Sequence, residues 1–401
     1  MIARSARLSF ILQHSLIVLV LLVMGSTMPM EKSSAVTSDP IQIGLSLCLT
    51  GRHEQPALMQ KRAYELWRDE VNGKGGILGR RIELNIIDDR CDLERARRAY
   101  RGFVAAGLID HVIGPYSSEI TAAIAPIIDA GGFPMLAAGA SSDEIWQKGY
   151  GGIFGMWTPA SRYTQGMLRL ASEAGLSSVA ILHADDTFSE GVASGVRKWA
   201  PFLKLKIELD VRLAQDPTGL EDDIRRAKDA RIDLIIVAGH LNEALRSRQA
   251  IAQVGWAPRA FYATVGPALP EWPVLVGDSD DRTFSTSIWE PNDSFPHSRD
   301  FAAAFKERFG VDPSYHAATA YAAGEILQGA ILAAGSVERE KVRQALYSLD
   351  TYTVLGRFAV DRKGMQVKRL EMIIQWQNGR KAVVWPEEIR TAAPVFGSGL
   401  P

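Results

Sequence analysis

Hydroxyl-bearing loops follow two neighbouring predicted strands and are the best candidates for chemistry in this sequence. The chain reads GPYSS at 114–118 before a predicted helix, and AAGAS at 137–141 after the next predicted strand. A hydroxyl group beside free backbone N–H groups at a helix N-terminus binds anions, which suits a carboxylate. Ser118 and Ser141 can also simply cap helices, and for either residue alone that interpretation is favoured. Two such loops at neighbouring strand ends favour a site for an acid group.

Corresponding loops occur in the second half of the chain. They carry DDTF at 185–188, GHL at 239–241 and TVG at 264–266. In open α/β sheets, ligands bind beyond the carboxyl ends of the strands, so Phe188 and His240 would face the first group of loops across a cleft. A single His or Phe is more often structural, so these two candidates depend mainly on their position.

Several catalytic patterns are incomplete. Gly73-x-Gly75 follows a predicted helix and precedes a predicted strand, the reverse of the order in a dinucleotide-binding fingerprint. The sequence GVASG at 191–195 has its serine one place too late for a nucleophile elbow, and the seven histidines are scattered. Asp88-Asp89-x-x-Asp92 lacks the other ligands of a calcium loop and is interpreted as a strand end plus a helix N-cap. The sequence therefore disfavours an enzyme, and we expect neither a metal nor a cofactor.

Composition indicates an ordinary globular protein of more than one domain. The chain has 401 residues, of which 47% are hydrophobic and 23% charged, and its formal net charge is −1. That length exceeds what one hydrophobic core usually holds, so two domains or three are expected. A near-neutral chain has no general attraction for nucleic acid, so no nucleic-acid partner is expected.

The N-terminus is typical of a secretory signal. Arg4 and Arg7 precede an apolar run from Leu16 to Met24, and small and polar residues follow. We therefore predict a signal peptide over 1–35 and export to the periplasm. The alternative is an uncleaved anchor, because the largely apolar stretch 8–24 is at the short end of the lengths that span a membrane.

Predicted strands and helices alternate along the first two thirds of the chain and form two series. This alternation predicts two parallel sheets with helices on both faces, that is, two doubly wound α/β lobes. The predicted strands are 41–45, 81–87, 111–113 and 133–136, then 178–183, 207–211, 234–238 and 260–264, and the helices are 57–71, 93–106 and 118–130, then 165–173, 191–200, 220–230 and 242–254.

The C-terminal third has too few elements for a domain of its own. A first predicted hairpin pairs 356–360 with 370–377 around a turn at 361–364, and a second turns at Asn378-Gly379 and pairs back through 382–385. The chain is therefore expected to cross between the lobes and complete both. The predicted helices of this part are 299–309, 317–334 and 341–349.

The order of several short stretches resembles the periplasmic solute-binding proteins of the branched-chain amino acid (Leu/Ile/Val) type, which deliver ligands to ABC importers. The resemblance covers about 40–386. The tail IQWQNG at 374–379 followed by VWP at 384–386 resembles a branch that includes binders of aromatic and other organic acids. The matching stretches are IQIG at 41–44, LTG at 49–51, VNGKGGI at 71–77, IDD at 87–89, VIG at 112–114, PMLAAGAS at 134–141, YHAATAY at 315–321 and GRF at 356–358.

The resemblance implies the type I periplasmic binding fold, with two doubly wound parallel-sheet lobes joined by three crossings. Lobe I would comprise 38–156 plus 291–352, and lobe II 157–290 plus 353–386. Residues 387–401 would form a C-terminal tail.

The resemblance also implies a ligand site. The ligand carboxylate would be held by Ser118, by the backbone around Gly139 and Ala140, and by Ser141. Phe188 stands where the amino-acid binders have a tyrosine that covers the ligand.

Further site residues follow from the same resemblance. His240 lies on the contact loop of the second lobe. The family's acidic residue for the ligand ammonium falls at about Val265, where this chain has no carboxylate. Trp157 and Trp289, near the predicted crossings, either stack on a flat ligand or pack the core and hinge.

Only two cysteines are present, which allows one disulfide in an oxidising compartment or two unpaired buried thiols. By resemblance, Cys91 keeps one cysteine of the family's disulfide while Ser117 replaces the other. Cys48, after the adjacent first strand, is the candidate substitute partner.

Together these features predict a periplasmic, non-enzymatic, monomeric protein that binds a small carboxylate and delivers it to an ABC permease in the inner membrane. A buried ammonium without a counter-charge costs several kcal/mol, so the absence of a carboxylate near Val265 favours an acid with an apolar or aromatic body over an amino acid. The alternatives are a ligand-sensing cytoplasmic regulator of the same fold and, less favoured, a periplasmic hydrolase.

Overall fold

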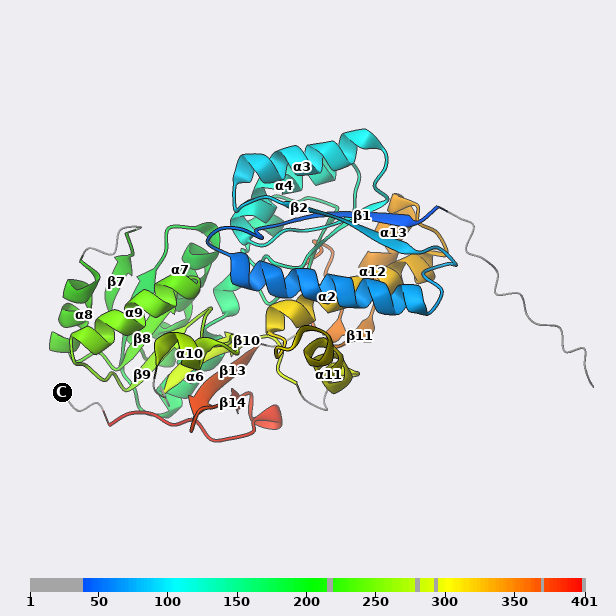
Figure 1. Cartoon of the computed structure of the whole chain (residues 1–401). Helices are drawn as coiled ribbons and strands as arrows, with labels where there is room; N and C mark the ends of the chain where they lie inside the picture. The colour runs from blue at the N-terminus through cyan, green and yellow to red at the C-terminus, as the bar shows by residue number, and fades with distance from the viewer. Residues whose placement is uncertain (1–38, 215–218, 278–281, 292–294, 369–370, 399–401) are drawn as a thin grey trace, which may run out of the picture. The chain divides into compact units, whose positions relative to one another are not determined.

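A computed structural model describes residues 39–214, 219–277, 282–291, 295–368 and 371–398 (Figure 1). The predicted signal peptide over 1–35 lies outside the described residues. Within these ranges, no helix is both long enough and apolar enough to cross a membrane.

The first sheet is entirely parallel, with its strands in the order β2-β1-β3-β4-β5. Figure 1 shows α3 and α4 on one face of this sheet and α2 on the other, as a doubly wound lobe requires. The strands are β1 (Ile41–Leu47), β2 (Ile82–Asp88), β3 (His111–Ile113), β4 (Met135–Ala137) and β5 (Ile153–Gly155), and the helices α2 (Glu54–Gly73), α3 (Leu93–Ala106), α4 (Ser118–Ala130) and α5 (Glu144–Gln147).

Three helices from the C-terminal third return to the first lobe. The longest, α12, is rich in alanine and packs directly against α2. Their backbones approach so closely that a Cβ added at Gly324 would lie 2.2 Å from the Trp67 ring. Glycine at this position therefore permits the contact. The three helices are α11 (Ser298–Phe309), α12 (Tyr315–Ala334) and α13 (Arg339–Ser348).

The second sheet has the order β14-β13-β10-β9-β8-β6-β7, with β6 to β10 parallel and β13 and β14 antiparallel. Its strands are β6 (Ser178–His183), β7 (Lys206–Arg212), β8 (Leu234–Ala238), β9 (Ala260–Ala263), β10 (Thr283–Ser287), β13 (Met372–Gln377) and β14 (Arg380–Trp385). The accompanying helices are α6 (Gln165–Glu173), α7 (Thr187–Trp199), α8 (Leu220–Asp229), α9 (Leu241–Gln253) and α10 (Trp272–Val276), with short 3-10 turns η1 (Ala160–Arg162), η2 (Pro201–Leu203) and η3 (Glu387–Ile389).

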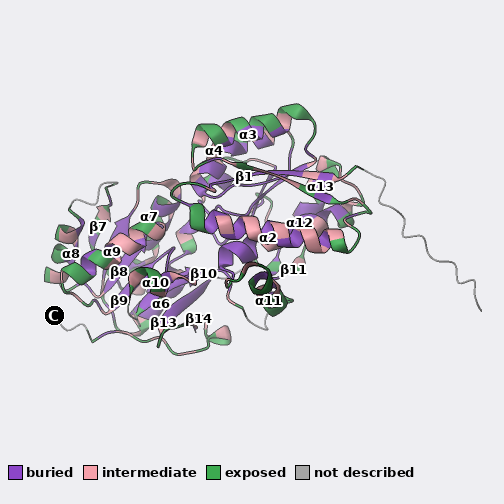
Figure 2. Ribbon diagram, viewed as in Figure 1, coloured by how far each residue is buried: buried purple, intermediate pink, exposed green. Residues whose placement is uncertain are grey.

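The core of each lobe lies on both faces of its sheet. Strand β8 reads LIIVA, and all of its residues are buried. Figure 2 shows the same pattern for the inner strands β8, β9 and β10 of the second sheet, while the outer faces of α8 and α9 are exposed. Continuous apolar strands of this kind are typical of parallel sheets covered on both sides.

Both sheets share one connectivity, because the first strand of each series pairs with the second and the third. The strand order therefore reverses between β1 and β3 in the first lobe and between β6 and β8 in the second. Such reversal points open a crevice at the carboxyl ends of the strands. The two doubly wound lobes that the sequence predicted are confirmed, and their reversal points indicate where a ligand would bind.

The chain passes between the two sheets three times. It leaves the first sheet after β5, returns from β10 to α11, and leaves again before β13. The third crossing lies later than the predicted lobe boundary at 353. A backbone hydrogen bond joins this later segment to β5 of the first sheet, since the Gly155 amide donates to the Gly364 carbonyl at 2.7 Å. Residues 356–364 therefore lie with the first sheet, whereas the sequence analysis assigned 353–386 to lobe II.

One predicted hairpin is wrong and the other is confirmed. Strand β12 (Gly356–Phe358) pairs with β11 (Thr351–Thr353) and not with 370–377, while β13 lies between β10 and β14. The alternating pattern of β12 fits either partner, so sequence pattern alone could not choose. The second hairpin turns where predicted, since Asn378 and Gly379 both have positive φ, as a tight hairpin turn requires.

Two elements of the second lobe differ from prediction for identifiable reasons. Strand β10 was missed because it reads TFSTS, which has no apolar run; buried hydrogen bonds stabilise it, including one from the Ser285 hydroxyl to the Ala263 carbonyl at 2.7 Å. Helix α7 begins at Thr187, four residues before the predicted start at 191, because Asp186 caps it.

The two cysteines form a disulfide between Cys48 and Cys91. The bond joins the residue after β1 to the turn after β2, and it resolves the alternative of two free thiols. The acidic turn at 88–92 lies beside this disulfide. It agrees with the predicted helix N-cap, since Asp92 accepts the Arg95 amide at 2.7 Å.

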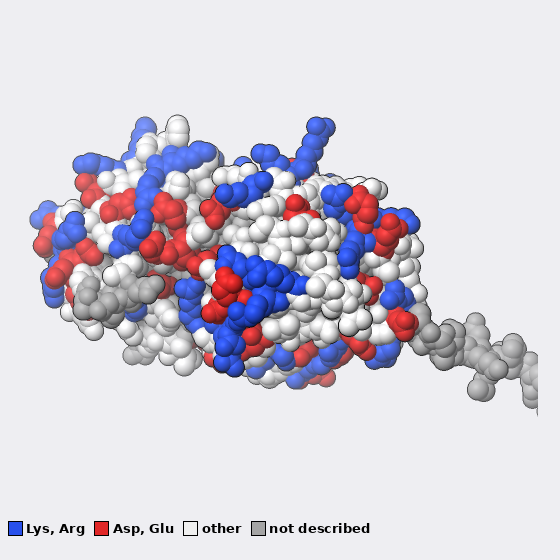
Figure 3. Space-filling view, turned by 90° about the horizontal axis from the view of Figure 1, so that it is seen from above, with Lys and Arg blue, Asp and Glu red and all other residues white. Residues whose placement is uncertain are grey.

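Charged side chains of both signs share the surface. Figure 3 shows Lys and Arg interspersed with Asp and Glu over the face seen from above. Many pairs lie along one helix, such as Arg226 with Asp223 at 2.8 Å and Lys341 with Glu338 at 2.7 Å. Exposed pairs of this kind contribute at most about 1 kcal/mol each, so they affect solubility more than the fold.

Candidate functional site

The loops at the two reversal points bring four residues together. His53 follows β1 and Tyr116 follows β3 in the first lobe, while Asp186 follows β6 and His240 follows β8 in the second. The ring centroids of His53 and His240 are 4.4 Å apart, and those of His53 and Tyr116 are 5.2 Å apart. The connectivity of the sheets thus places side chains from both lobes in contact at the crevice.

Further rings extend this contact into what we call the aromatic group. Phe188 lies 5.4 Å from both Tyr163 and His240, measured between ring centroids. His316 lies 5.3 Å from Tyr116. The aromatic group comprises His53, Tyr116, Trp157, Tyr163, Phe188, His240, Tyr315 and His316.

A cavity of about 240 Å³ adjoins the aromatic group and is lined by both lobes. The predicted residues His240 and Val265 lie together on its second-lobe side. Val265 is only 4% exposed, so the position where the resemblance placed an ammonium partner is a buried apolar side chain. The lining residues are Gly51, Arg52, His53, Glu54, Gln55, Pro56, Tyr116, His240, Leu241, Asn242, Val265 and Leu269.

The two predicted serines are also brought together. Ser118 Oγ accepts the backbone N–H groups of Ser141 and Ser142 at 3.0 and 3.1 Å. The Ser142 hydroxyl in turn donates to the Thr187 carbonyl of the second lobe at 3.2 Å. The Ser141 amide is therefore already engaged, and the groups here that can bind an acid are the hydroxyls of Ser118 and Ser141.

Gly139 and Ala140 support this loop. A Cβ at Gly139 would lie 2.7 Å from the Pro115 carbonyl oxygen and 2.8 Å from the Tyr116 Cα, so only glycine lets the loops after β3 and β4 approach. The Ala140 side chain is fully buried in the core that also contains Trp146. Both side-chain positions are explained by packing.

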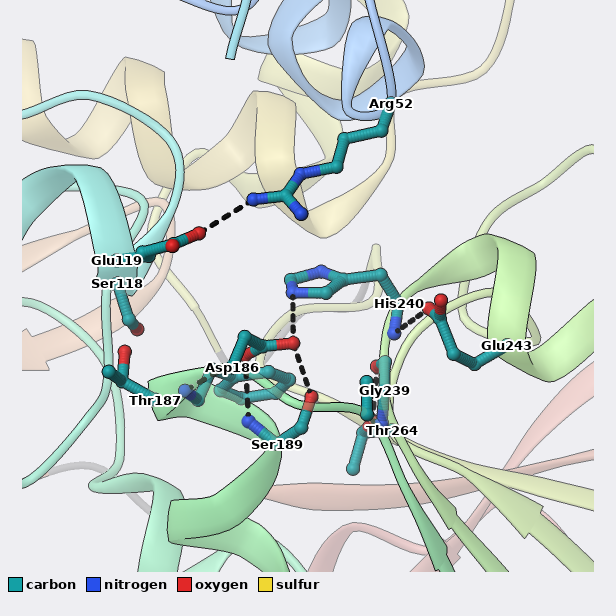
Figure 4. Close-up of polar contacts among 12 residues, drawn as sticks. Arg52, Ser118, Glu119, Asp186, Thr187, Ser189, Gly239, His240, Glu243 and Thr264 are labelled. Atoms are coloured by element: carbon teal, nitrogen blue, oxygen red, sulfur yellow. Dashed lines mark hydrogen bonds and ion pairs between the residues drawn. The ribbon is translucent and has the colours of Figure 1, made fainter. Parts of the chain in front are cut away.

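Asp186 and His240 form a linked pair in the second lobe (Figure 4). Asp186 Oδ1 accepts the amides of Phe188 and Ser189, each at 3.0 Å, and Oδ2 accepts the Ser189 hydroxyl at 2.8 Å. His240 Nε2 lies 3.7 Å from Asp186 Oδ2. Burial alone would raise the pKa of Asp186, but His240 and the groups of Ser189 outweigh it and hold this pKa well below its usual range.

Arg52 lies above this pair and belongs to the loop after β1. Its guanidinium contacts the Glu119 carboxylate at 2.6 Å, with side chains 49% and 35% exposed (Figure 4). An ion pair this accessible to water contributes little to stability. Arg52 therefore lies at the rim of the cavity, paired with Glu119.

The histidines of the first lobe are held uncharged. Burial, together with smaller effects of His240 and Arg52, lowers the pKa of His53 to about 2. Burial, followed by His240, lowers the pKa of His316 to about 3. At neutral pH these rings are therefore neutral hydrogen-bonding groups.

Several buried polar atoms around the aromatic group have no hydrogen-bond partner among the described residues. Each such atom normally costs about 1–3 kcal/mol, so a cluster of them calls for an explanation. A bound molecule with hydrogen-bonding groups would supply one. The atoms are Ser141 Oγ, the hydroxyls of Tyr163 and Tyr315, Nδ1 of His240 and both ring nitrogens of His316.

The two predicted tryptophans have different environments. Trp157 belongs to the aromatic group, with its ring 5.9 Å from His316 and its indole N–H donating to Thr319 at 3.2 Å. Trp289 contacts Phe301 at 5.6 Å and donates to the Ser298 hydroxyl at 3.0 Å. The contacts of Trp289 therefore agree with the packing alternative.

Sequence reasoning missed several members of the site. His316 lies in a stretch quoted for the resemblance and Tyr116 in the loop at 114–118, but neither was given a role. His53 was overlooked because the strand order was unknown, and only that order shows that the loop after β1 faces the loop after β3. Tyr163 follows the first crossing, where no pattern indicated a site.

Comparison with known proteins identifies the class. Residues 40–381 match the family described as periplasmic binding protein, so the chain belongs to the periplasmic binding protein family. The resemblance stated from the sequence is confirmed, as is the type I fold with two lobes.

Individual relatives agree with this assignment. The leucine-, isoleucine-, valine-, threonine- and alanine-binding protein of Pseudomonas aeruginosa is 27% identical over 337 residues, which is 83% of this chain and 88% of that protein. A leucine-binding protein of Thermotoga maritima has a similar structure, with a TM-score of 0.78 at 21% identity, covering 87% of this chain and 100% of the other. A solute-binding protein of R. palustris in complex with benzoate gives a TM-score of 0.75 at 17% identity, covering 89% and 97%.

Proposed function

We propose that this protein is the non-enzymatic, periplasmic ligand-binding component of an ABC importer, and that it binds a small carboxylate with an apolar or aromatic body between its lobes. The observation that carries the proposal is the composition of the site. The hydroxyls of Ser118 and Ser141 lie on the adjoining loops after β3 and β4, and Val265, where the resemblance expects the carboxylate for a ligand ammonium, lines the cavity beside the aromatic group.

Asp186, which lies beside His240, does not replace the missing carboxylate. Asp186 accepts three hydrogen bonds from Phe188 and Ser189, and its remaining lone-pair direction faces His240. A carboxylate has about four lone-pair directions, so this one has none left for a ligand ammonium. Burying an ammonium without a partner costs several kcal/mol, which disfavours a free amino acid.

A second candidate ligand is nevertheless an amino acid, because the relative from Pseudomonas aeruginosa is named for binding amino acids. A neighbouring cleft of about 670 Å³ along α7 is lined by Glu119, Asp185 and Glu190, among others. Each of these carboxylates already pairs with an arginine, so a cationic group of the ligand would compete with Arg52, Arg212 and Arg197 for them.

Binding would couple to the arrangement of the lobes. The contacts between His53 and His240, and between Ser142 and Thr187, join the two lobes beside the cavity. A ligand that contacts both lobes binds the closed arrangement more tightly and shifts the population toward it. That change is the signal a permease would recognise, and it requires no covalent chemistry.

The cellular setting is part of the same proposal. The predicted signal peptide over 1–35 would export the chain, and the mature protein would act as a monomer with a permease of the inner membrane. Detection of the mature protein in the cytosol would favour the regulator alternative instead. Turnover abolished by changing a single nucleophile would favour the hydrolase.

Calorimetric titration tests the ligand class. We expect benzoate to bind and leucine to bind more weakly, because the site has hydroxyl donors and apolar rings, and Asp186 is already engaged. Tight binding of leucine or valine without binding of benzoate would overturn the preference and favour the amino-acid candidate.

Ser141→Ala tests the carboxylate position. The Ser141 hydroxyl has no partner among the described residues, so its removal should leave the melting temperature unchanged while ligand affinity falls roughly tenfold, the value of one hydrogen bond to a charged group. Ser348→Ala on the exposed end of α13 is the matched control. Ser118→Ala should weaken binding too, but it should also destabilise the fold, because two buried amides lose their acceptor. Unchanged affinity in Ser141→Ala would refute the placement.

A further inference from the structure

The loop at 49–53 lies between β1 and α2 and supplies three residues to the inter-lobe cavity. Gly51, Arg52 and His53 line this cavity of about 240 Å³, and the ring centroid of His53 lies 4.4 Å from that of His240. The loop belongs neither to the strand before it nor to the helix after it. Its position therefore depends on contacts with other parts of the chain.

The first of these contacts is made by Asp88, the last residue of β2. Its Oδ1 accepts the amides of Leu49 and Thr50 at 3.0 and 3.3 Å, and its Oδ2 accepts the Thr50 hydroxyl at 2.7 Å. Oδ1 also accepts the Arg90 amide at 3.0 Å, so one carboxylate joins the loop to the turn after β2. Burial alone would raise the pKa of Asp88, but the hydrogen bonds that it accepts outweigh burial and lower this pKa. The loop is thus bound to a charged carboxylate.

The second contact is the disulfide between Cys48 and Cys91. A Cβ added at Gly51 would lie 3.5 Å from Cys91 Sγ and 3.6 Å from Cys48 Sγ, and the φ of 119° at Gly51 favours glycine. Gly51 therefore lies beside the disulfide and also lines the cavity. The Cys91 amide donates to the fully buried Asp89 at 2.9 Å, and Asp89 accepts the Ser46 hydroxyl of β1 at 2.6 Å. The turn that carries Cys91 is thus anchored to β1 independently of the loop.

We infer that Asp88 and the Cys48–Cys91 disulfide are positioning groups for the ligand site, which hold the loop at 49–53 so that Arg52 and His53 stay at the cavity. Neither group is among the described residues that line the cavity. The inference rests on the proposed function, because it takes this cavity as the place where the ligand binds. When the binding-competent conformation is only partly populated, the apparent affinity falls in proportion to that population. Loss of either group should therefore weaken binding without removing any contact to the ligand.

Hydrogen exchange of the full chain, followed by mass spectrometry, tests the positioning without any ligand. Asp88→Ala should speed exchange at the amides of Leu49 and Thr50 by about tenfold, because each loses its acceptor. Asp88→Asn keeps an acceptor oxygen and should restore most of the protection. Thr50→Val removes only the hydroxyl bond at an exposed position and should have a smaller effect in the same direction. Exchange of this loop that is unchanged in both Asp88→Ala and Thr50→Val would overturn the role of Asp88.

Benzoate affinity, measured by calorimetry, tests the consequence for binding. The apparent Kd should rise about tenfold in Asp88→Ala and in the double variant Cys48→Ser/Cys91→Ser, because the loop then spends less time in the competent conformation. Gly324→Ala is the control, because it disturbs the packing of the same lobe at Trp67 and not at the loop, and it should bind benzoate as the unmodified protein does. An affinity that is unchanged in both loop variants, or that falls equally in Gly324→Ala, would overturn the inference. If benzoate does not bind the unmodified protein, the ligand class of the proposed function fails, and the exchange of the loop then decides the inference alone.

Discussion

Acidification should destabilise this protein through its buried histidines. His53 and His316 are neutral in the folded protein because burial opposes their protonation, which lowers their pKa values to about 2 and about 3. In the unfolded chain the same side chains titrate near the ordinary value of about 6.5. Below that pH the unfolded state binds more protons, so the stability present above it is lost progressively as the pH falls toward the folded values.

The size of the effect follows from the shift. Each unit of pH below the unfolded value costs about 1.4 kcal/mol for a group that stays neutral in the folded state. At pH 5.0 each of the two histidines therefore contributes a loss of about 2 kcal/mol. At His53, His240 and Arg52 add to the effect of burial on the pKa, whereas Asp186 opposes it.

The assay is urea unfolding at pH 7.5 and pH 5.0 for the unmodified protein and for His316→Phe. Many carboxylates contribute to the total pH dependence, but the difference between the two proteins isolates His316. The variant should lose about 2 kcal/mol less stability over this interval than the unmodified protein. His297→Gln, at a side chain that is 77% exposed, should show the pH dependence of the unmodified protein. An identical pH dependence in His316→Phe would refute the assignment of a neutral, strongly shifted imidazole.

Two further predictions concern packing and the covalent cross-link. Gly324→Ala should destabilise the protein by about 1–3 kcal/mol in thermal unfolding, because the new Cβ would lie 2.2 Å from the buried Trp67 ring. Gly329→Ala on the same helix, where the nearest neighbour of a new Cβ is 3.8 Å away, should be neutral or stabilising by a few tenths of a kcal/mol. Equal effects of the two substitutions would contradict the close helix contact. Reduction of the Cys48–Cys91 disulfide, which closes a loop of 43 residues, should lower the unfolding free energy by about 4 kcal/mol in denaturant titrations, and an unchanged midpoint would show that the bond does not constrain the unfolded chain.

Sequence reasoning predicted the fold well where apolar periodicity is strong. Helices α3, α4 and α6 and strands β6 and β8 have the bounds that the pattern indicated. It failed where polar hydrogen bonds replace apolar burial, as in β10, and where a strand has two possible partners, as in β12. These cases are decided by tertiary contacts that no local pattern contains.

The site was predicted in part for a related reason. Residues at the ends of strands were found because each loop directly follows an apolar run, which placed Ser118, Phe188 and His240 near the crevice. The sequence could not show that Ser118 accepts two amides of the adjacent loop, since that bond depends on how closely the loops after β3 and β4 approach. The role of His53 depends on strand order, which only the assembled sheet reveals.

Native mass spectrometry tests the central claim most directly. The chain, isolated without denaturation and mixed with equal amounts of benzoate, 4-hydroxybenzoate, leucine and a neutral sugar, should form a one-to-one complex with an acid. The complex should weaken in Ser141→Ala. A complex only with the neutral sugar, or an acid complex that is unaffected when Ser141, His240 and His316 are each replaced, would contradict binding of a carboxylate between the two lobes.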